Sequence, residues 1–336
     1  LSSVRVTNNA TPWEGGAAFP GSGSSNTPGA TRGDLRIGSK PIDGGNGILA
    51  YNYFPTNGDM VMDTSENWAS SGGSFIFLRN TILHEHGHGM GLRHVCPSNS
   101  TKLMEPFLTT AFDGPQHDEL RATHVLYGDA YESNDNTGSA TPLGALFNGV
   151  VFQPSVIPGT PIANGSVTSI AIDGDSDYYR VTVAAPLAGS VQVTPLGLNY
   201  ADYPQDQACS NNVANTNSLV QADLAIDLVT GAGTVVQTVN LAGPGGSEVL
   251  ASGLFSPAGN MFIRVYEVNA PTQSQLYNLT VTGQTPPTMS ATDNTFTDRV
   301  RITWTTPAGG IVSYGVFRGT SNDRNAATQL AINLIC

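Results

Sequence analysis

The chain has 336 residues and a formal net charge of −12, because 14 Lys and Arg stand against 26 Asp and Glu. This length exceeds an ordinary domain and predicts two to three of them. The sparse basic residues form no cluster that would neutralise a phosphate backbone, so nucleic acid is not expected as a partner. Since no apolar run approaches the roughly 18 residues that cross a bilayer, a transmembrane segment is not expected either.

The first 130 residues combine short strand patterns with two helical ones. Residues 8–33 are rich in Gly, Pro and Ser and predict an extended surface loop. Apolar positions recur at helical spacing over residues 77–90, which lack proline, and a second helix is predicted over 117–128. Between the loop and the first helix, strands are predicted at 35–38, 48–54 and 59–63.

From Asp129 onward the sequence changes to runs of alternating apolar and polar residues, separated by Gly, Pro and Asn clusters. This pattern is typical of an antiparallel β-sandwich. Its clearest strands are predicted at 178–184, 189–195, 223–229, 261–268 and 277–283. Pro286 and Pro287 indicate a linker. The tail after it has the pattern of another sandwich's opening strands, but it is shorter than the roughly 100 residues such a domain takes.

The three cysteines, Cys96, Cys209 and Cys336, form no close pair and no C-x-x-C motif. At least one must be left over, so the sequence predicts no disulfide framework and leaves the pairing open. The chain starts at Leu1 without a signal peptide and stops at Cys336 within a strand pattern. We therefore expect a processed product or a piece of a longer one.

The segment from His84 to His94 reads H-E-x-x-H-x-x-G-x-x-H. Residues four apart lie on one helix face, so His84 and His88 can bind one metal ion. A continued helix, rising about 1.5 Å per residue, would carry His94 too far to reach the same ion. Gly91 permits a left-handed backbone that turns the chain back and makes His94 the third ligand. Three protein ligands leave a fourth position open, which predicts a catalytic zinc site.

Glu85 follows the first of these histidines and is expected near the metal without being a ligand. Zinc lowers the pKa of bound water towards about 7, and Glu85 would act as general base as that water attacks a peptide carbonyl. The alternative is a helix whose histidines are ordinary surface or core residues, which the eleven-residue match disfavours. His86 falls at an unspecified position, so a solvent-facing or supporting role is expected for it.

Together with the residues that follow it, this motif resembles the metzincin metallopeptidases and, among them, the matrixins. Met104, ten residues after His94, looks like the methionine of the Met-turn that lies beneath the zinc in that clan. Residues 32–44, 48–55 and 57–68 are similar to the matrixin strands that precede the active-site helix. The resemblance implies an α+β metzincin-like catalytic domain over residues 1–130, with a mixed twisted sheet and an active-site helix. The family's first strand and first helix have no evident counterpart, so an incomplete N-terminal part is expected.

The matrixin resemblance also concerns further metals. Asp63 and Glu66 match two carboxylates that hold calcium in the family, and ordinary solvated acidic residues are the equal alternative. Tyr51 and Val61 stand where matrixins have histidines for a second, structural zinc, so that site is expected to be absent. The implied cofactors are catalytic Zn²⁺ and structural Ca²⁺.

Residues 131–284 resemble the bacterial pre-peptidase C-terminal domain, on the strength of the segments 131–136 and 173–180. An acidic turn is favoured over a calcium site in the second segment. Residues 285–336 look like the beginning of a fibronectin type III domain. These resemblances imply all-β antiparallel sandwich modules after the catalytic domain, and a secreted, extracellular protein of bacterial origin.

The resemblance implies a secreted zinc-dependent endopeptidase acting on protein or peptide substrates, with Gly91 and Met104 supporting the site. Two other functions stay open. An extracellular adhesion or binding protein would carry an incomplete, inactive metalloprotease-like domain and would use its β modules. A metallohydrolase would act on another substrate, such as a small amide.

Overall fold

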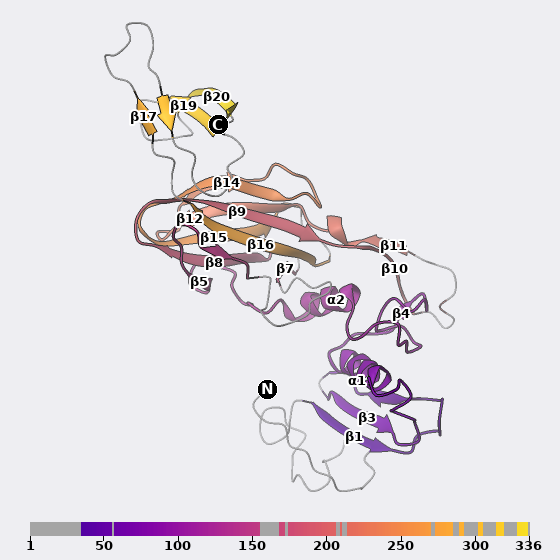
Figure 1. Cartoon of the computed structure of the whole chain (residues 1–336). Helices are drawn as coiled ribbons and strands as arrows, with labels where there is room; N and C mark the ends of the chain where they lie inside the picture. The colour runs from indigo at the N-terminus through magenta and orange to yellow at the C-terminus, as the bar shows by residue number, and fades with distance from the viewer. Residues whose placement is uncertain are drawn as a thin grey trace. The chain divides into compact units, whose positions relative to one another are not determined.

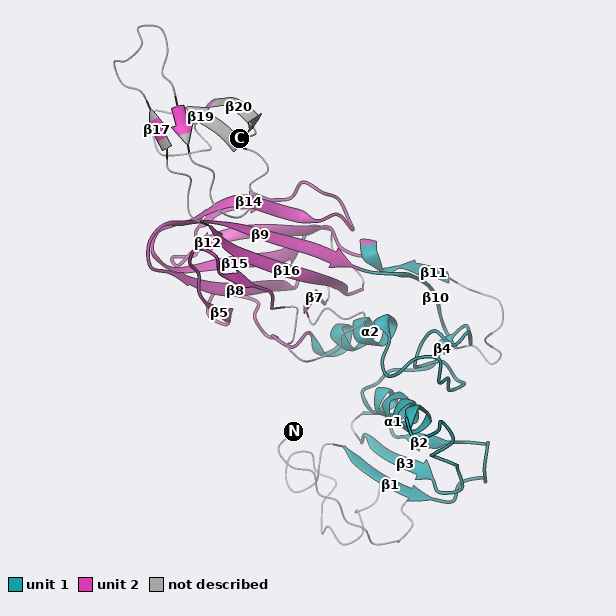
Figure 2. Ribbon diagram, in the orientation of Figure 1, with its two compact units in different colours: residues 1–128, 161–165, 197–219 teal, residues 129–160, 166–196, 220–336 magenta. Residues whose placement is uncertain are grey.

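The computed structural model divides the chain into two compact units (Figures 1 and 2). Among the described residues, the first unit comprises the chain up to Gly128 together with residues 197–219, and the second unit comprises the others. The predicted loop at 8–33 and Cys336 lie outside the described residues. Within the described part, no helix is long and apolar enough to cross a membrane. The structure describes residues 35–55, 57–154, 168–171, 174–205, 209, 214–269, 273–284, 289–291, 302–304, 314–318 and 328–334.

A mixed three-stranded sheet opens the first unit, in the order β1-β3-β2. Strand β1 (Arg36–Lys40) runs parallel to β3 (Asp59–Asp63), and β2 (Ala50–Asn52) pairs antiparallel with β3. All five residues of β3 are buried, as a central strand covered on its faces requires. The predicted mixture of strands and helix is confirmed here, and β2 forms an edge of the sheet.

Helix α1 (Ile76–Gly89) packs on this sheet and carries the first part of the zinc motif. Leu78 and Ile82, four residues apart, lie on one helix face and pack against the apolar cluster of β2 and β3. On another side of the helix, the buried Asn80 side chain donates to the carbonyls of Thr109 and Phe112 at 2.9 and 2.8 Å. Apolar and polar contacts together fix the orientation of the helix.

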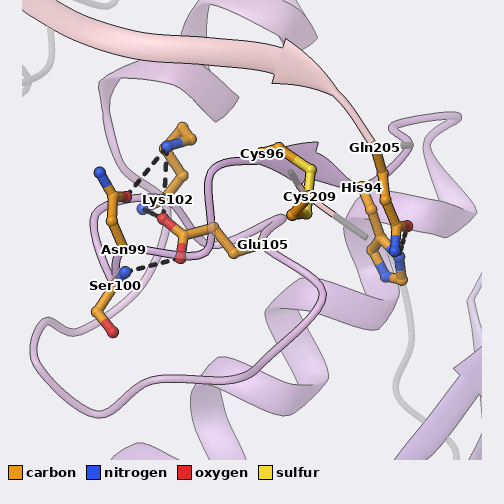
Figure 3. The surroundings of a disulfide bond; sticks show 8 residues. All are labelled: His94, Cys96, Asn99, Ser100, Lys102, Glu105, Gln205 and Cys209. Carbon is orange, nitrogen blue, oxygen red and sulfur yellow. Dashed lines mark hydrogen bonds and ion pairs between the residues drawn. A yellow bond between two sulfur atoms is a disulfide. The ribbon is translucent and has the colours of Figure 1, made fainter. Parts of the chain in front are cut away.

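Helix α2 (His117–Tyr127) and a second small sheet complete the first unit. The sheet has the order β11-β10-β4, from β4 (Val95–Cys96), β10 (Asn199–Pro204) and β11 (Ala214–Asn217). A disulfide joins Cys96 to Cys209, which are 113 residues apart (Figure 3). The sequence left the pairing of the cysteines open, and folding decides it by bringing together two that are distant in sequence.

The loop between β4 and α2 is built around a buried ion pair (Figure 3). The Glu105 carboxylate accepts the backbone N–H groups of Ser100 and Thr101 at 2.7 and 2.9 Å. Lys102 Nζ lies 3.4 Å from the same carboxylate, and both side chains are almost completely buried. The Lys102 N–H also donates to it at 3.0 Å, so several bonds to one carboxylate hold this loop next to Met104.

The second unit is a β-sandwich of two sheets. One sheet has the order β13-β12-β15-β8-β5, and the other has the order β14-β9-β16-β6, with β7 also paired to β16. The strands are β5 (Thr141–Ala145), β6 (Val151–Phe152), β7 (Thr168–Ile170), β8 (Ser176–Val183), β9 (Leu187–Leu196), β12 (Leu224–Thr230), β13 (Val235–Val239), β14 (Glu248–Phe255), β15 (Gly259–Glu267) and β16 (Gln275–Gln284). A short 3₁₀ turn (Ser218–Val220) precedes β12.

The predicted antiparallel pairing holds for most of this sandwich but not for its β5 edge. Strands β5 and β8 pair parallel, from Thr141 opposite Tyr179 to Ala145 opposite Thr182. Between β5 and β8 the chain forms β6 and β7 of the other sheet, and this crossover returns it in the same direction. The alternating patterns in the sequence predicted the long strands of the sandwich, but neither β5 nor its parallel pairing.

The expected domain 131–284 contains residues that the structure assigns to the first unit. Residues 197–219 belong there, while the main boundary falls between Gly128 and Asp129. After the sandwich, the described residues form two strand pairs, β17 (Met289–Ala291) with β18 (Ile302–Trp304) and β19 (Tyr314–Arg318) with β20 (Thr328–Leu334). The division by family resemblance, including the fibronectin-like tail, stays a prediction.

Candidate metal centre

The three histidines of the motif meet at one point. His84 and His88 lie one turn apart on α1, which ends at Gly89, and Gly91 has a φ of 102° that turns the chain back towards the helix. His94 Nε2 lies 3.1 Å from Nε2 of His84 and 3.0 Å from Nε2 of His88. Among the described residues, these three side chains form one of two groups close enough to share a metal ion.

The hydrogen bonds on the far side of each ring decide which nitrogen carries the proton. Nδ1 of His84 lies 2.7 Å from the Leu103 carbonyl, and Nδ1 of His88 lies 2.8 Å from the Leu92 carbonyl. Nδ1 of His94 lies 2.7 Å from the Gln205 side-chain oxygen. Because these oxygens can only accept, each Nδ1 carries the hydrogen and each Nε2 presents a lone pair.

Three converging lone pairs favour a cation at their centre. With no hydrogen between them, nitrogens 3.0 to 3.1 Å apart repel each other unless a positive ion lies at their centre. Nitrogens placed about 2.0–2.1 Å from a tetrahedral zinc ion would be separated by about 3.3 Å, close to the observed spacing. Burial lowers the pKa of His84 to about 4 and also lowers the pKa of His88, which keeps both rings in the neutral form that binds metal.

Glu85 is the buried carboxylate beside this centre. Only 6% of its surface is exposed, and its Oε2 atom has no hydrogen-bond partner within the described residues. Burial raises the pKa of Glu85 to about 7. The side chain lines the same cavity as the three histidines, so its oxygen can receive a proton from a molecule bound there.

Met104 lies directly beneath the helix that carries the histidines. The residue is 2% exposed, and a Cβ atom on Gly87 would lie 2.5 Å from its sulfur atom. Glycine at position 87 therefore leaves room for the methionine side chain. The sequence motif did not indicate this, because position 87 is one that the motif leaves unspecified.

The Glu119 carboxylate accepts the Met104 N–H at 2.9 Å and the Gln116 N–H at 2.8 Å. Glu119 was missed in the sequence, although Gln116-x-x-Glu119 is a capping-box pattern that would have revealed its local role.

A cavity of about 880 Å³ opens over the centre. One wall is the edge strand β2, another is helix α1, and a third is the segment after Met104. Its described lining includes Ala50, Tyr51, Asn52, Phe77, Thr81, Pro106, Phe107, Leu108 and Gln205 in addition to the three histidines and Glu85. The site therefore has three histidines that could bind a metal ion at the base of a largely apolar groove, and the edge strand β2 forms one side of this groove.

Asp63 and Glu66, which match calcium-binding carboxylates of matrixins, are not among the residues that line this cavity. Asp63 is buried and accepts the N–H groups of Ser65 and Asp43 at 2.7 and 3.2 Å. Glu66 accepts the N–H of Asn46 at 2.7 Å. Both side chains therefore contact the loop between β1 and β2, and they do not belong to either group of three described side chains that could share a metal ion.

The second group that could share a metal lies in the second unit. Glu132, Asp135 and Asp175 place one carboxylate oxygen each within 4.8 Å of the others. Burial, with the nearby Asp175 charge adding to it, raises the pKa of Glu132 to about 7. For the segment with Asp175 the sequence had favoured an acidic turn over a calcium site, and this group does not decide between the two.

Residues 32–128 match the family model Matrixin (Peptidase_M10). Over 120 residues the chain is 35% identical to Matrix metalloproteinase-18 of Xenopus laevis, covering 33% of this chain and 24% of that protein. It is 32% identical over 111 residues to Neutrophil collagenase of Homo sapiens, covering 31% and 23%. The chain thus spans about a quarter of the length of these relatives. The matches cover the segment with the three histidines and support a metallopeptidase.

Two solved structures are weakly similar to part of the chain. The pre-peptidase C-terminal domain of collagenase from Bacillus anthracis is 14% identical with a TM-score of 0.23, and it covers 42% of this chain and 93% of that domain. The carbohydrate-binding module CBM36, in complex with calcium and xylotriose, is 17% identical with a TM-score of 0.24, and it covers 39% and 97%.

Proposed function

We propose that the chain is a zinc-dependent endopeptidase. The observation that carries this proposal is the convergence of three Nε2 lone pairs, from His84, His88 and His94, beside the buried carboxylate of Glu85. The similarity of residues 32–128 to matrixins supports it. Gly91 and Met104 support the site by turning the chain and by filling the space beneath α1.

The chain's own residues have distinct tasks in this proposal. The three histidines hold the metal, and zinc when bound supplies a Lewis acid that polarises the scissile carbonyl and makes water more acidic. Glu85 accepts the proton of the attacking water and transfers it to the leaving amine nitrogen. Its position in the cavity wall, with Oε2 lacking a partner among the described residues, suits a group that exchanges protons.

A polypeptide in extended form is the substrate that the cavity fits best. Strand β2 is an edge strand, and its residues 50–52 line the cavity above the centre. An edge strand can bind an extended peptide as an additional strand, which would hold a peptide bond over the three histidines. A protein or peptide substrate therefore accounts for both the strand edge and the apolar walls.

We place the protein outside the cell. The disulfide between Cys96 and Cys209 favours an oxidising compartment, where such bonds persist.

Calcium is proposed as a second, structural cation near Asp63 and Glu66, because both carboxylates contact the loop between β1 and β2, which also contains Asp43. That ion would fix the loop between β1 and β2 beside the cavity.

The proposal is tested by Glu85→Gln in the whole chain, with Asp113→Asn as the control at an exposed carboxylate. We expect Glu85→Gln to retain zinc by metal analysis and to lose casein or peptide-library cleavage by about 10²–10⁴-fold, because the general base is removed. The control should cleave like the parent, and a chelator should abolish its activity until zinc is restored. Zinc binding without cleavage by the parent would instead favour the adhesion protein with an inactive domain.

A further inference from the structure

We propose that Gln205 is a positioning residue for the third histidine of the metal centre, His94, and that the Cys96–Cys209 disulfide holds it there. The proposal rests on the proposed zinc site. It adds a residue that lies 111 positions after His94, outside the part of the chain that matches the matrixin model. We call residues 197–219, which belong to the first unit, the clasp.

Gln205 contacts His94 twice (Figure 3). Its side-chain oxygen lies 2.7 Å from His94 Nδ1, and its backbone N–H donates to the His94 carbonyl at 3.2 Å. The two bonds orient both the ring and the backbone of the same residue. A ring whose Nδ1–H is held in this way directs its Nε2 lone pair to the point shared with His84 and His88.

The three histidines differ in the source of this support. His84 and His88 are held by backbone carbonyls of Leu103 and Leu92, which lie within 19 residues of them in the sequence. His94 instead depends on a side chain supplied by the clasp. A substitution outside residues 32–128 can therefore change the position of the His94 ring, but not the bonds that hold the other two rings.

The clasp is bonded to the segment around His94 both before and after Gln205. Immediately before it, β10 pairs with β4, so that Pro204 lies opposite Val95 and Tyr203 opposite Cys96. Four residues after it, Cys209 forms the disulfide with Cys96, which is itself two residues after His94. The backbone around Gln205 is thus joined to the backbone around His94 by a strand pairing and by a covalent bond (Figure 3).

Helix α2 anchors the base of the clasp. Nε2 of His117 lies 2.9 Å from the Ser218 hydroxyl, and the Ser218 hydroxyl also donates to the Leu198 carbonyl at 3.0 Å. Arg121 donates to the Tyr200 hydroxyl at 2.5 Å. None of these contacts involves a proposed metal ligand. They hold the ends of the clasp on α2 independently of the metal centre.

The test measures zinc affinity of the whole chain by competition with a chromogenic chelator. We expect Gln205→Ala to bind zinc about 10–100-fold more weakly, because loss of such an outer partner commonly has that effect. Gln205→Glu retains an acceptor oxygen and should restore the affinity. The matched control is Asn215→Ala, which changes an exposed side chain of β11 in the same clasp and should bind zinc like the parent.

Cobalt substitution separates positioning from a general loss of structure. The visible absorption of bound Co²⁺ reports ligand geometry, so it should change in Gln205→Ala and return towards the parent spectrum in Gln205→Glu. Parent-like zinc affinity and cobalt spectrum in Gln205→Ala would overturn the role of Gln205 while leaving the proposed zinc site intact. Failure of the parent chain to bind zinc would instead overturn the proposed function itself.

The contribution of the disulfide is tested with Cys96→Ser/Cys209→Ser, which also avoids free thiols that bind zinc. We expect the double variant to weaken zinc binding, and we expect little further loss when Gln205→Ala is added, because both changes release the same contact. Amide exchange in α1, in the same unit as the disulfide, checks that this unit stays folded. Fully additive losses, or parent-like affinity in the double variant, would show that the disulfide does not act through Gln205.

Discussion

The interiors of the two units are built from different contacts. The sandwich encloses one continuous apolar core to which the long strands of both sheets contribute, with Tyr179, Ile226, Phe255, Ile263 and Leu279 completely buried. The first unit has a much smaller apolar cluster beneath α1, formed by Ala50, Met60 and Met62 with partly buried neighbours. Among the described residues, apolar burial therefore contributes more to the sandwich than to the first unit.

Specific polar and covalent links replace apolar burial in the first unit. Arg36 and Asp59 form a buried ion pair, with Arg36 Nε 2.7 Å from the carboxylate. Asn80 bonds to two carbonyls, Glu119 supports the Met104 backbone, and a disulfide closes the clasp. Links of this kind depend on individual partners, so we expect zinc and single polar contacts to affect the first unit more than the apolar core of the sandwich.

The largest expected effect is in the sandwich core. Phe255→Ala removes a completely buried ring and should lower the free energy of unfolding of the sandwich by about 3–5 kcal/mol. Leu254→Ala, at an exposed neighbouring position, should change it by less than about 0.5 kcal/mol. Denaturant titration followed by hydrogen exchange on β12 and β15 measures both. A comparable fall in zinc affinity in Phe255→Ala would show that the two interiors are not independent.

Zinc loading should have the next largest effect, and it should be confined to the first unit. At a free zinc concentration 100 times Kd, binding stabilises the folded form by about 2.7 kcal/mol, and amide exchange in α1 should slow accordingly. Exchange in β15 should not change. His94→Ala serves as the control, since it removes a proposed ligand and should lose the response. Equal protection of α1 and β15 would contradict the contrast between the units.

Calcium should give the smallest effect. At ten times Kd it would stabilise the first unit by about 1.4 kcal/mol, with slower exchange in the loop between β1 and β2, where Asp63 and Glu66 bond to the backbone. Glu66→Gln should reduce this response. Protection that appears instead around Asp135 would assign calcium to the carboxylate group of the sandwich, and an unchanged response in Glu66→Gln would count against the site in the first unit.

The parts of the site that sequence could predict are those set by local geometry. Spacing along one helix placed His84 and His88 on the same face, and a glycine after that helix explained how His94 could return. The helices and most strands were predicted for the same reason, since alternation and helical periodicity are properties of neighbouring residues. Met104 was indicated through its resemblance to a known motif, whereas its fit against Gly87 required the folded structure.

Gln205, the Cys96–Cys209 bond and the parallel β5 edge were not predictable in this way. Each depends on which distant segments meet, and glutamine at 205 has no local pattern that distinguishes it from the other polar residues of the clasp. Glu119 is an intermediate case, because its capping pattern is local but its bond to Met104 is not.

The sequence by itself determined the chemistry available to this protein: three imidazoles and a carboxylate at spacings that a helix and a glycine turn convert into one site. Tertiary structure alone decided what holds the third imidazole, because the clasp reaches His94 from more than one hundred residues away. Local spacing is encoded by covalent connectivity and backbone geometry, while a long-range contact exists only after the intervening chain has folded.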